Sequence, residues 1–383
     1  MKERKRKKNH GQPKLTGKES RSLAASIFDN DSKPSSISLS EIFNERSVAA
    51  EKKSCSTLFD RSKSNTFLKK SISRKNHNLV KMRNDCDPLE MRKRRTNSEA
   101  HKALVSKLTA PVAQIELASK IMVQYGVVIL TNVSSSAEKS SVIPQNVSKL
   151  LKDYSDNIEQ EVCARLDVEK INWRTFEEKN SSQMNELTNE SNSFRYKEVA
   201  SRCLGRLDVR WRTNLFPFNA PEVVENTYIT KLMEKLLGKD AKLLYCGLIY
   251  SMPNSADQPW HQDGTPLFDD SELKVDVPPY AMNVFIPLNN IDEAIGPTEF
   301  ILESHKNEHA RRINLNIDKA IQRDYQPIGP LLFSGEVLIY DYRVCHRGAK
   351  NLSTQTRTML YLMYARPWFK EHLNFSEDCL FEN

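Results

Sequence analysis

The 383-residue sequence predicts an α+β fold in which helices come first and a β-sandwich or jelly roll follows. Between residues 111 and 238, apolar side chains recur at the three- and four-residue spacing of amphipathic helices. After Gly238 they gather instead into short runs rich in β-branched and aromatic residues, separated by Pro, Gly, Asn or Asp. Such runs are typical of strands, so the second half of the folded part is predicted to be a β-core.

The N-terminal part of the chain differs in composition from the rest. Residues 1–100 hold 25 Lys and Arg against 12 Asp and Glu, a net charge of +13, so the remainder carries −5. Residues 1–105 are rich in Ser, Lys, Arg and Asn and show no sustained periodicity, which predicts a disordered basic tail. Residues 106–383 contain no convincing Ser-, Asn- or Gly-rich break and are predicted to form one domain.

Two short basic clusters lie in this predicted tail, at residues 4–8 and 92–95. They are compatible with a nuclear import signal or a contact with nucleic acid or acidic lipid, and equally with a merely solvated tail. Seven dispersed cysteines indicate a reduced, intracellular protein, cytoplasmic or nuclear. We expect no secretion signal, no membrane span and no C-terminal peroxisomal signal. Nothing in the sequence indicates an oligomeric state.

The elements can be placed in chain order. Helices are predicted over 111–126, 147–166 and 221–238, with a short buried strand at 127–130 after the first of them. The later strands are predicted over 242–252, 282–288, 298–302, 335–341 and 359–365.

A metal site is predicted at His261 and Asp263, which lie on an extended segment after the predicted strand 242–252. Side chains at i and i+2 of an extended chain share a face, so these two point together while Gln262 points away. His346 follows a predicted strand and can face the same cavity. Alone, each residue is more often structural than functional. Together, two histidines and one carboxylate in this order are typical of non-haem Fe(II) oxygenases.

Arg357 is the fourth predicted member of the site. The midpoint between His346 and Arg357 falls in the turn-like run 350–354, so we expect a hairpin that places the two residues on paired strands. A planar, permanently charged guanidinium beside an open metal face suits the carboxylate of a co-substrate such as 2-oxoglutarate.

Two other patterns compete with or extend this interpretation. His305-Lys-Asn-Glu-His309 matches the zinc-peptidase pattern H-x-x-E-H, but that motif requires a long helix and here follows a strand. Arg206, Arg210 and Arg212 precede the β-core and form either an anion-binding group or a salt-bridged cluster.

Four stretches resemble the phytanoyl-CoA dioxygenase family of Fe(II)/2-oxoglutarate oxygenases over roughly residues 110–370. They are residues 258–264, 296–306, 335–348 and 357–369, and the Gly-Pro-Thr-Glu-Phe…Ser-His-Lys run is the most specific of them. The resemblance implies a double-stranded β-helix core wrapped by N-terminal helices. It also implies that His261, Asp263 and His346 bind iron and that Arg357 binds the C5 carboxylate of 2-oxoglutarate.

The resemblance adds three details to the site. An intact Asp263 favours hydroxylation, because related halogenases carry a small residue there. Gly348 stands where some relatives have a hydroxyl residue, so one hydrogen bond to the co-substrate is absent or supplied elsewhere. Gln262 and Asn283 are further candidates for cofactor contacts, although a structural, hydrogen-bonded role competes for Asn283.

The function that we expect uses Fe(II), O2 and 2-oxoglutarate to hydroxylate an unidentified small-molecule or acyl substrate, with release of succinate. The alternative is a non-catalytic jelly-roll binding or regulatory protein whose basic tail contacts nucleic acid or another partner. A complete set of ligands and the arginine favour the enzyme.

Overall fold

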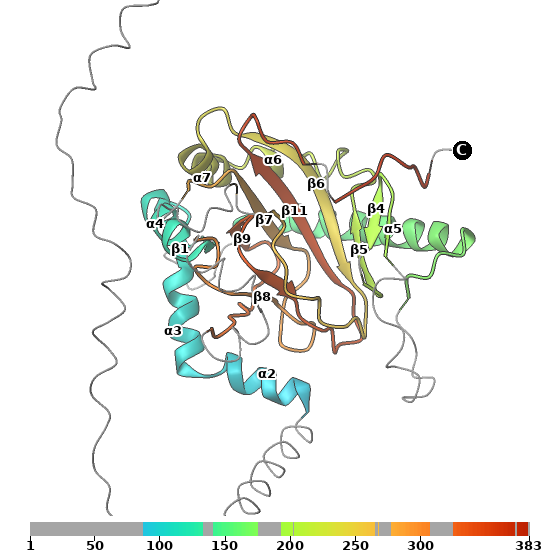
Figure 1. Cartoon of the computed structure of the whole chain (residues 1–383), viewed down its shortest axis with the longest axis horizontal. Coiled ribbons are helices and arrows are strands. Elements are labelled where there is room, and N and C mark those ends of the chain that lie inside the picture. Colours follow the sequence, from blue (N-terminus) through green and yellow to red (C-terminus); the bar gives the residue numbers. More distant parts are fainter. Residues whose placement is uncertain are drawn as a thin grey trace, which may run out of the picture. The chain divides into compact units, whose positions relative to one another are not determined.

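As the sequence predicts, all the helices of the described residues precede β6, although five short strands lie among them, and the described strands form two sheets (Figure 1). The computed structural model describes residues 87–132, 141–174, 193–201, 203–264, 267, 277–306, 325–371 and 374–381. The predicted α+β fold with a β-core of jelly-roll type is confirmed. None of the helices in this described part of the chain is long and apolar enough to cross a membrane.

A nine-stranded sheet forms the larger part of the β-core. In the order in which they lie side by side, its strands are β1 (Thr109–Pro111), β2 (Val127–Thr131), β9 (Val337–Asp341), β7 (Ala281–Pro287), β11 (Arg357–Ala365), β6 (Lys242–Ser251), β5 (Arg206–Val209), β4 (Val199–Ser201) and β3 (Phe194–Arg195). Strands β1 and β2 run parallel, and the other neighbours are antiparallel. The predicted strands at 127–130, 242–252, 282–288, 335–341 and 359–365 are all present within a few residues.

The second sheet is small and carries part of the candidate site. It consists of β8 (Thr298–Phe300) and β10 (His346–Gly348), which pair antiparallel with His346 opposite Phe300 and Gly348 opposite Thr298. The Tyr340 ring on β9 of the large sheet lies 5.3 Å from the Phe300 ring and 4.8 Å from the His346 ring, centroid to centroid. Tyr340 therefore joins the two sheets beside the cavity that they share.

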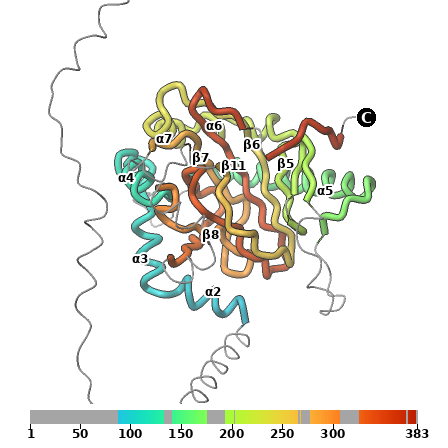
Figure 2. Tube along the Cα trace, viewed as in Figure 1, coloured from blue at the N-terminus to red at the C-terminus, as the bar shows by residue number. Residues whose placement is uncertain are grey.

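The predicted helices are confirmed as α4 (Ile115–Tyr125), α5 (Gln145–Val168), and the pair α6 (Pro221–Val224) and α7 (Thr227–Leu237). Gly126 ends α4 in the left-handed conformation, with φ of 78°, and its N–H donates to the carbonyl of Met122. Figure 2 shows α4 and α7 side by side at one end of the large sheet. Their apolar faces, together with that of α5, build one core with the strands.

Alternation along the central strands separates this core from the candidate site. On β7, Asn283 and Phe285 line the cavity, whereas Met282 and Val284, which alternate with them, are fully buried in the apolar core. One face of the sheet therefore stabilises the fold while the other is available for chemistry.

Two helices stand where we predicted disorder, so that prediction is wrong for residues 87–105. They are α2 (Pro88–Thr96) and α3 (Glu99–Leu108), and residues 1–86 of the predicted tail lie outside the described residues. Local signals for α2 were present in the sequence: the Asp87 side chain accepts from the N–H of Leu89, Pro88 opens the first turn and basic residues occupy the last. They were missed because α2 has almost no apolar face.

Candidate metal and co-substrate site

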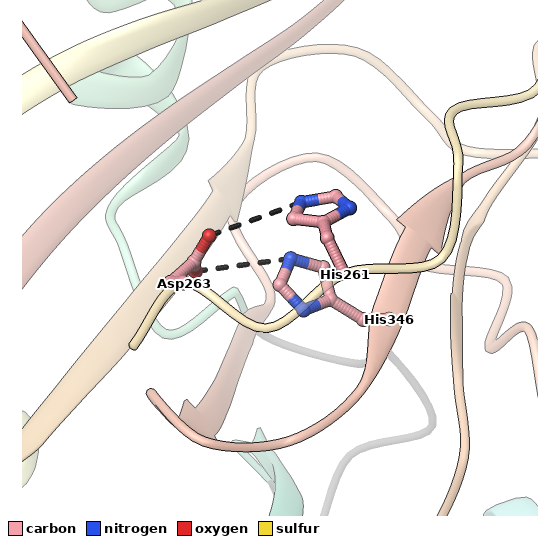
Figure 3. Close-up of side chains that lie close together, drawn as sticks. All are labelled: His261, Asp263 and His346. Carbon is pink, nitrogen blue, oxygen red and sulfur yellow. Dashed lines mark ion pairs between the residues drawn. The ribbon is translucent and has the colours of Figure 1, made fainter. Parts of the chain in front are cut away.

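His261, Asp263 and His346 come together as the sequence predicts (Figure 3). Their potential ligand atoms all lie within 4.8 Å of one another. The Nε2 atom of His261 is 3.9 Å from Oδ1 of Asp263, and Nε2 of His346 is 3.7 Å from Oδ2. His346 is buried, whereas His261 and Asp263 are partly exposed, so the cluster opens toward solvent on one side. Two imidazoles and one carboxylate are a donor set suited to Fe(II) with further coordination positions open.

Backbone carbonyls fix how both imidazoles present themselves. Nδ1 of His261 lies 2.8 Å from the carbonyl oxygen of Pro259, and Nδ1 of His346 lies 3.0 Å from that of Val344. A carbonyl oxygen can only accept, so Nδ1 carries the proton in each ring. Nε2 of each is then the unprotonated, metal-binding atom, and it is the atom turned toward Asp263.

The predicted hairpin between His346 and Arg357 is wrong. His346 pairs with Phe300 on β8 and, through one isolated bridge, with His261, while Arg357 pairs with Ser251 on β6. In the bridge the N–H of each histidine donates to the carbonyl of the other, at 3.0 Å and 2.8 Å. This backbone pair sets the two ligands face to face. It joins segments far apart in the chain, so no local sequence pattern predicts it.

The run predicted to be a hairpin turn is instead a packed loop. Asn351 is fully buried, and its side chain donates to the carbonyls of Ser251 and Gln355. The N–H of Ser353 donates back to the Asn351 side chain. The loop therefore returns the chain to the large sheet, where β11 takes its place between β6 and β7.

Two neutral donors hold the carboxylate of Asp263. Oδ2 accepts a hydrogen bond of 2.7 Å from Nδ2 of Asn283 and one of 2.9 Å from the hydroxyl of Tyr340. Nδ2 of Asn283 also lies 3.0 Å from the Tyr340 hydroxyl. Burial and the neighbouring Asp263 charge raise the pKa of Tyr340, so it remains a proton donor. Asn283 thus acts by orienting a predicted metal ligand. We did not foresee Tyr340, whose only signal is its place on a strand that faces the site.

Arg357 lies at the start of β11 with its guanidinium in the same cavity. Its side chain is 3% exposed, Nη1 donates to the carbonyl of Gly296 at 2.8 Å, and Nε has no hydrogen-bond partner. Burial, together with the charges of Arg206 and Arg92, lowers the pKa of Arg357 to about 9. The group is still a cation at pH 7. Within the described residues no carboxylate pairs with it.

Another buried polar atom in the cavity lacks a partner. The Oγ1 atom of Thr298, on β8, has no hydrogen-bond partner, and Thr298 lines the cavity together with Arg357 and His346. Buried polar groups are normally hydrogen-bonded, so unsatisfied ones that face a cavity indicate a polar ligand. Asn283 Oδ1 and the Tyr245 hydroxyl, which also line the cavity, are unsatisfied as well. An oxo-acid whose one end binds a metal and whose other end is a carboxylate fits the unsatisfied groups of Arg357 and Thr298.

Gln262 does not join the cavity. Its Nε2 atom donates to the carbonyl of Arg343, and it is not among the residues that line the site. His305 of the competing zinc pattern contacts the carbonyl of Val123 at 3.2 Å through Nε2, and burial lowers its pKa. Glu308 and His309 lie outside the described residues. The metal-ligand group found in the described part of the chain is therefore His261, Asp263 and His346.

The three arginines before the β-core have separate surroundings. Arg206 is buried against main-chain carbonyls, and Arg212 pairs with Glu161 at the surface. Arg210 is stacked between the rings of Tyr245 and Phe375, 3.6 Å from each centroid. They do not form one anion-binding cluster.

Helix α2 is fastened to the small sheet through Glu299 on β8. This carboxylate is 2% exposed, pairs with Arg95 of α2, and accepts at 2.8 Å from both Nε and Nη2 of Arg347 on β10. Arg92 of α2 donates from Nη1 to the carbonyls of Glu293 and Lys350, at 2.5 Å and 3.0 Å. The basic cluster that we predicted as a possible import signal is thus partly engaged in holding the strands beside His346.

The sequence model of the family described as Phytanoyl-CoA dioxygenase (PhyH) matches residues 122–359, more than half of the chain. The chain belongs to this family, and it is accordingly an oxidoreductase of the oxygenase class. The match includes all four residues that we predicted as metal ligands and carboxylate-binding arginine.

Several solved structures are similar to the chain at low identity. EvdMO1 shares 16% identity with a TM-score of 0.42, over 66% of this chain and 50% of that one, so the chain spans half the length of EvdMO1. AviO1 from Streptomyces viridochromogenes shares 15% identity with a TM-score of 0.41, over 71% and 97% of the two chains. The non-haem alpha ketoglutarate dependent epimerase SnoN from nogalamycin biosynthesis shares 14% identity with a TM-score of 0.40, over 66% and 81%. Family membership rests on the matched sequence and not on these likenesses.

Proposed function

We propose that the chain is an Fe(II)- and 2-oxoglutarate-dependent dioxygenase that hydroxylates a small-molecule or acyl substrate. The observation that carries this proposal is that a two-histidine-one-carboxylate group and a buried arginine without an ion-pair partner among the described residues line one cavity. The first suits a divalent iron, and the second suits the far carboxylate of an oxo-acid. Iron and 2-oxoglutarate, when bound with O2, would supply the chemistry: 2-oxoglutarate is decarboxylated oxidatively to succinate and CO2, and the substrate gains a hydroxyl group.

The residues of the chain bind and orient the reactants. His261 and His346 would present Nε2 to the metal while Nδ1 donates to a carbonyl oxygen, which fixes the orientation of both rings. Asp263 would offset part of the metal's charge, and Asn283 and Tyr340 keep its carboxylate from rotating. We propose hydroxylation and not halogenation because this carboxylate is present.

Arg357 would set the direction in which 2-oxoglutarate lies. Its guanidinium is fixed to the Gly296 carbonyl, so its remaining donors can hold a carboxylate at the buried end of the cavity. The oxo-acid end then faces the metal ligands. Burial strengthens this contact, because water competes little for a side chain that is 3% exposed.

Anaerobic addition of Fe(II) and 2-oxoglutarate to the purified protein tests the assignment. We expect a visible charge-transfer band that neither reagent gives alone, and no band in the His261→Ala/Asp263→Ala double variant. Absence of the band in the unaltered protein, or an equal band in the double variant, would contradict the proposal.

A turnover measurement separates the enzyme from the non-catalytic alternative. Under air, the protein with Fe(II) and 2-oxoglutarate should release succinate slowly even without a substrate, and the double variant should not. Mass spectrometry of cell extract treated with the protein should then reveal products heavier by one oxygen atom that depend on added 2-oxoglutarate. Succinate release no faster than in the double variant would favour a binding protein.

A further inference from the structure

A second buried arginine lies in register with Arg357. Ser251 on β6 is paired with Arg357 on β11 on one side and with Arg206 on β5 on the other. Directly paired residues of neighbouring strands share a face of the sheet, so the two arginines flank Ser251 on the cavity side. Both line the cavity that contains the candidate metal ligands.

Arg206 has polar partners but forms no ion pair among the described residues. Its side chain is 4% exposed, and Nη1 donates to the hydroxyl of Ser251 at 2.6 Å. Nη2 donates to the carbonyls of Ala256, Ala349 and Gly348, at 2.9, 2.7 and 3.2 Å. Nε donates to the Ala256 carbonyl as well, at 3.1 Å. These five contacts fix the guanidinium, but none of them cancels its charge. A buried cation of this kind is costly unless an anion is bound nearby.

The tip of Arg206 occupies the space that a side chain at position 348 would need. A Cβ atom built on Gly348 would lie 2.5 Å from Nη1 of Arg206 and 2.6 Å from Oε1 of Gln258. Both contacts are closer than real Cβ atoms tolerate. Gly348 is paired with Thr298, whose hydroxyl has no partner and lines the same cavity. In this chain the Arg206 guanidinium therefore occupies the space into which any larger residue at position 348 would project.

We infer that Arg206 is a second binding residue for the far carboxylate of 2-oxoglutarate, and that its Nη1 group donates to this carboxylate from the space beside Gly348. This inference rests on the proposed function, because it concerns the same co-substrate. Arg357 and Arg206 hold the carboxylate from the two positions that flank Ser251 in one row of the sheet, and Thr298 lies on the small sheet. The hydrogen bond from Arg206 comes from a charged donor, which is stronger than a neutral one.

The competing explanation is that Arg206 only clamps the loop carbonyls of Ala256, Gly348 and Ala349. Removing it would then loosen the whole cavity and weaken every ligand alike. A co-substrate analogue without the far carboxylate separates the two roles. In 2-oxopentanoate a methyl group replaces that carboxylate while the oxo-acid end is unchanged.

The experiment is calorimetric titration of anaerobic, Fe(II)-loaded protein with 2-oxoglutarate and with 2-oxopentanoate. In Arg206→Met we expect the Kd for 2-oxoglutarate to rise at least about ten-fold, the effect of losing one charge-assisted hydrogen bond, while that for 2-oxopentanoate changes by less than about two-fold. Arg206→Lys keeps the charge and is the variant to use if Arg206→Met folds poorly. Its Kd for 2-oxoglutarate should lie between those of the unaltered protein and of Arg206→Met. Equal weakening of both ligands, or no weakening of either, would overturn the inference.

A swap sharpens the test. Gly348→Ser alone should weaken 2-oxoglutarate binding, because its side chain meets Nη1 of Arg206. In the Arg206→Met/Gly348→Ser double variant the thioether and the end of the flexible Gln258 side chain can both move aside and the hydroxyl can reach the carboxylate, so binding should be tighter than in either single variant. Additive losses would contradict a shared position. If the unaltered protein binds neither ligand, the proposed function fails with it; if it binds 2-oxoglutarate and the variants behave otherwise than stated, only the role of Arg206 fails.

Discussion

Two buried arginines beside the cavity have opposite surroundings. Arg343, just after β9, is 3% exposed and meets Asp341 with two parallel hydrogen bonds, Nε to Oδ1 at 2.9 Å and Nη2 to Oδ2 at 2.7 Å. Arg357, at the start of β11, is equally buried, yet among the described residues its guanidinium donates only to the Gly296 carbonyl. One guanidinium has its counter-ion within the fold. The other has none among the described residues.

The difference separates a structural cation from a binding cation. Taking a charge out of water costs roughly several kcal/mol unless an opposite charge and hydrogen bonds compensate. For Arg343 they do compensate. For Arg357 burial and two neighbouring cations lower the pKa to about 9, so the surroundings disfavour the charge that the side chain still carries. We propose that the fold retains such a group for an anion that binds, and the cavity would place that anion beside the candidate metal ligands.

The largest effect on stability should follow from breaking the compensated pair. Arg343→Met leaves the Asp341 carboxylate buried without its partner, and we expect the free energy of unfolding to fall by about 3–5 kcal/mol. Urea denaturation measures it. The Asp341→Asn/Arg343→Met double variant is the control and should recover most of the loss, because no unpaired charge remains. A loss below about 1 kcal/mol in the single variant would show that the pair is not structural.

The opposite result is expected for Arg357→Leu. The Kd for 2-oxoglutarate should rise about 100-fold, equivalent to about 2.7 kcal/mol, because a desolvated charge-assisted contact is lost. Stability should change little or increase, because a buried, uncompensated charge is removed. Calorimetric titration and urea denaturation of the same preparation check both halves. A variant that loses stability as Arg343→Met does would erase the distinction between the two arginines.

Glu299 presents an intermediate case, in which one buried carboxylate serves two arginines. Glu299→Gln keeps the shape but removes the charge that holds Arg95 and Arg347, and we expect a loss of about 2 kcal/mol, less than for Arg343 because both guanidiniums are about one-quarter exposed. Helix α2 should then open locally. Trypsin cleavage after Lys93 or Arg94 should be faster than in the unaltered protein, and Glu90→Gln on the exposed side of α2 is the matched control. Equal cleavage rates would mean that Glu299 does not hold α2.

The parts of the molecule that the sequence predicted are those set by local patterns. Alternation and β-branched composition were enough for the central strands, and periodicity was enough for α4, α5 and α7. The pair His261 and Asp263 was predictable for the same reason, because side chains two residues apart on an extended chain share a face.

What escaped prediction depends on partners far along the chain. Strand β10 has three residues and exists because it pairs with β8. The hairpin expectation for His346 and Arg357 failed because β11 finds its partners in β6 and β7, which no turn signal near Asn351 encodes. Helix α2 was judged by its lack of apolar residues, yet its buried contacts are ionic: Arg95 meets Glu299, and Arg92 reaches carbonyls of the β-core. A propensity argument made within one window cannot weigh these contacts.

The smallest expected effect concerns the support of Asp263. Tyr340→Phe removes one of the two hydrogen bonds to Oδ2 and leaves that from Asn283. Loss of a hydrogen-bond partner of a metal-binding carboxylate commonly weakens metal binding by about 10- to 100-fold. Because one donor remains here, we expect the lower value, a Kd for Fe(II) or Co(II) that rises about ten-fold. Tyr364→Phe, which loses a hydrogen bond to the carbonyl of Val224 away from the cavity, is the matched control and should leave metal binding unchanged. If the two variants bound metal equally well, the Tyr340 hydroxyl would serve the packing between the sheets and not the carboxylate. If Tyr340→Phe alone loses affinity, the large sheet contributes to both halves of the site, holding the metal through Asp263 and the co-substrate through Arg357.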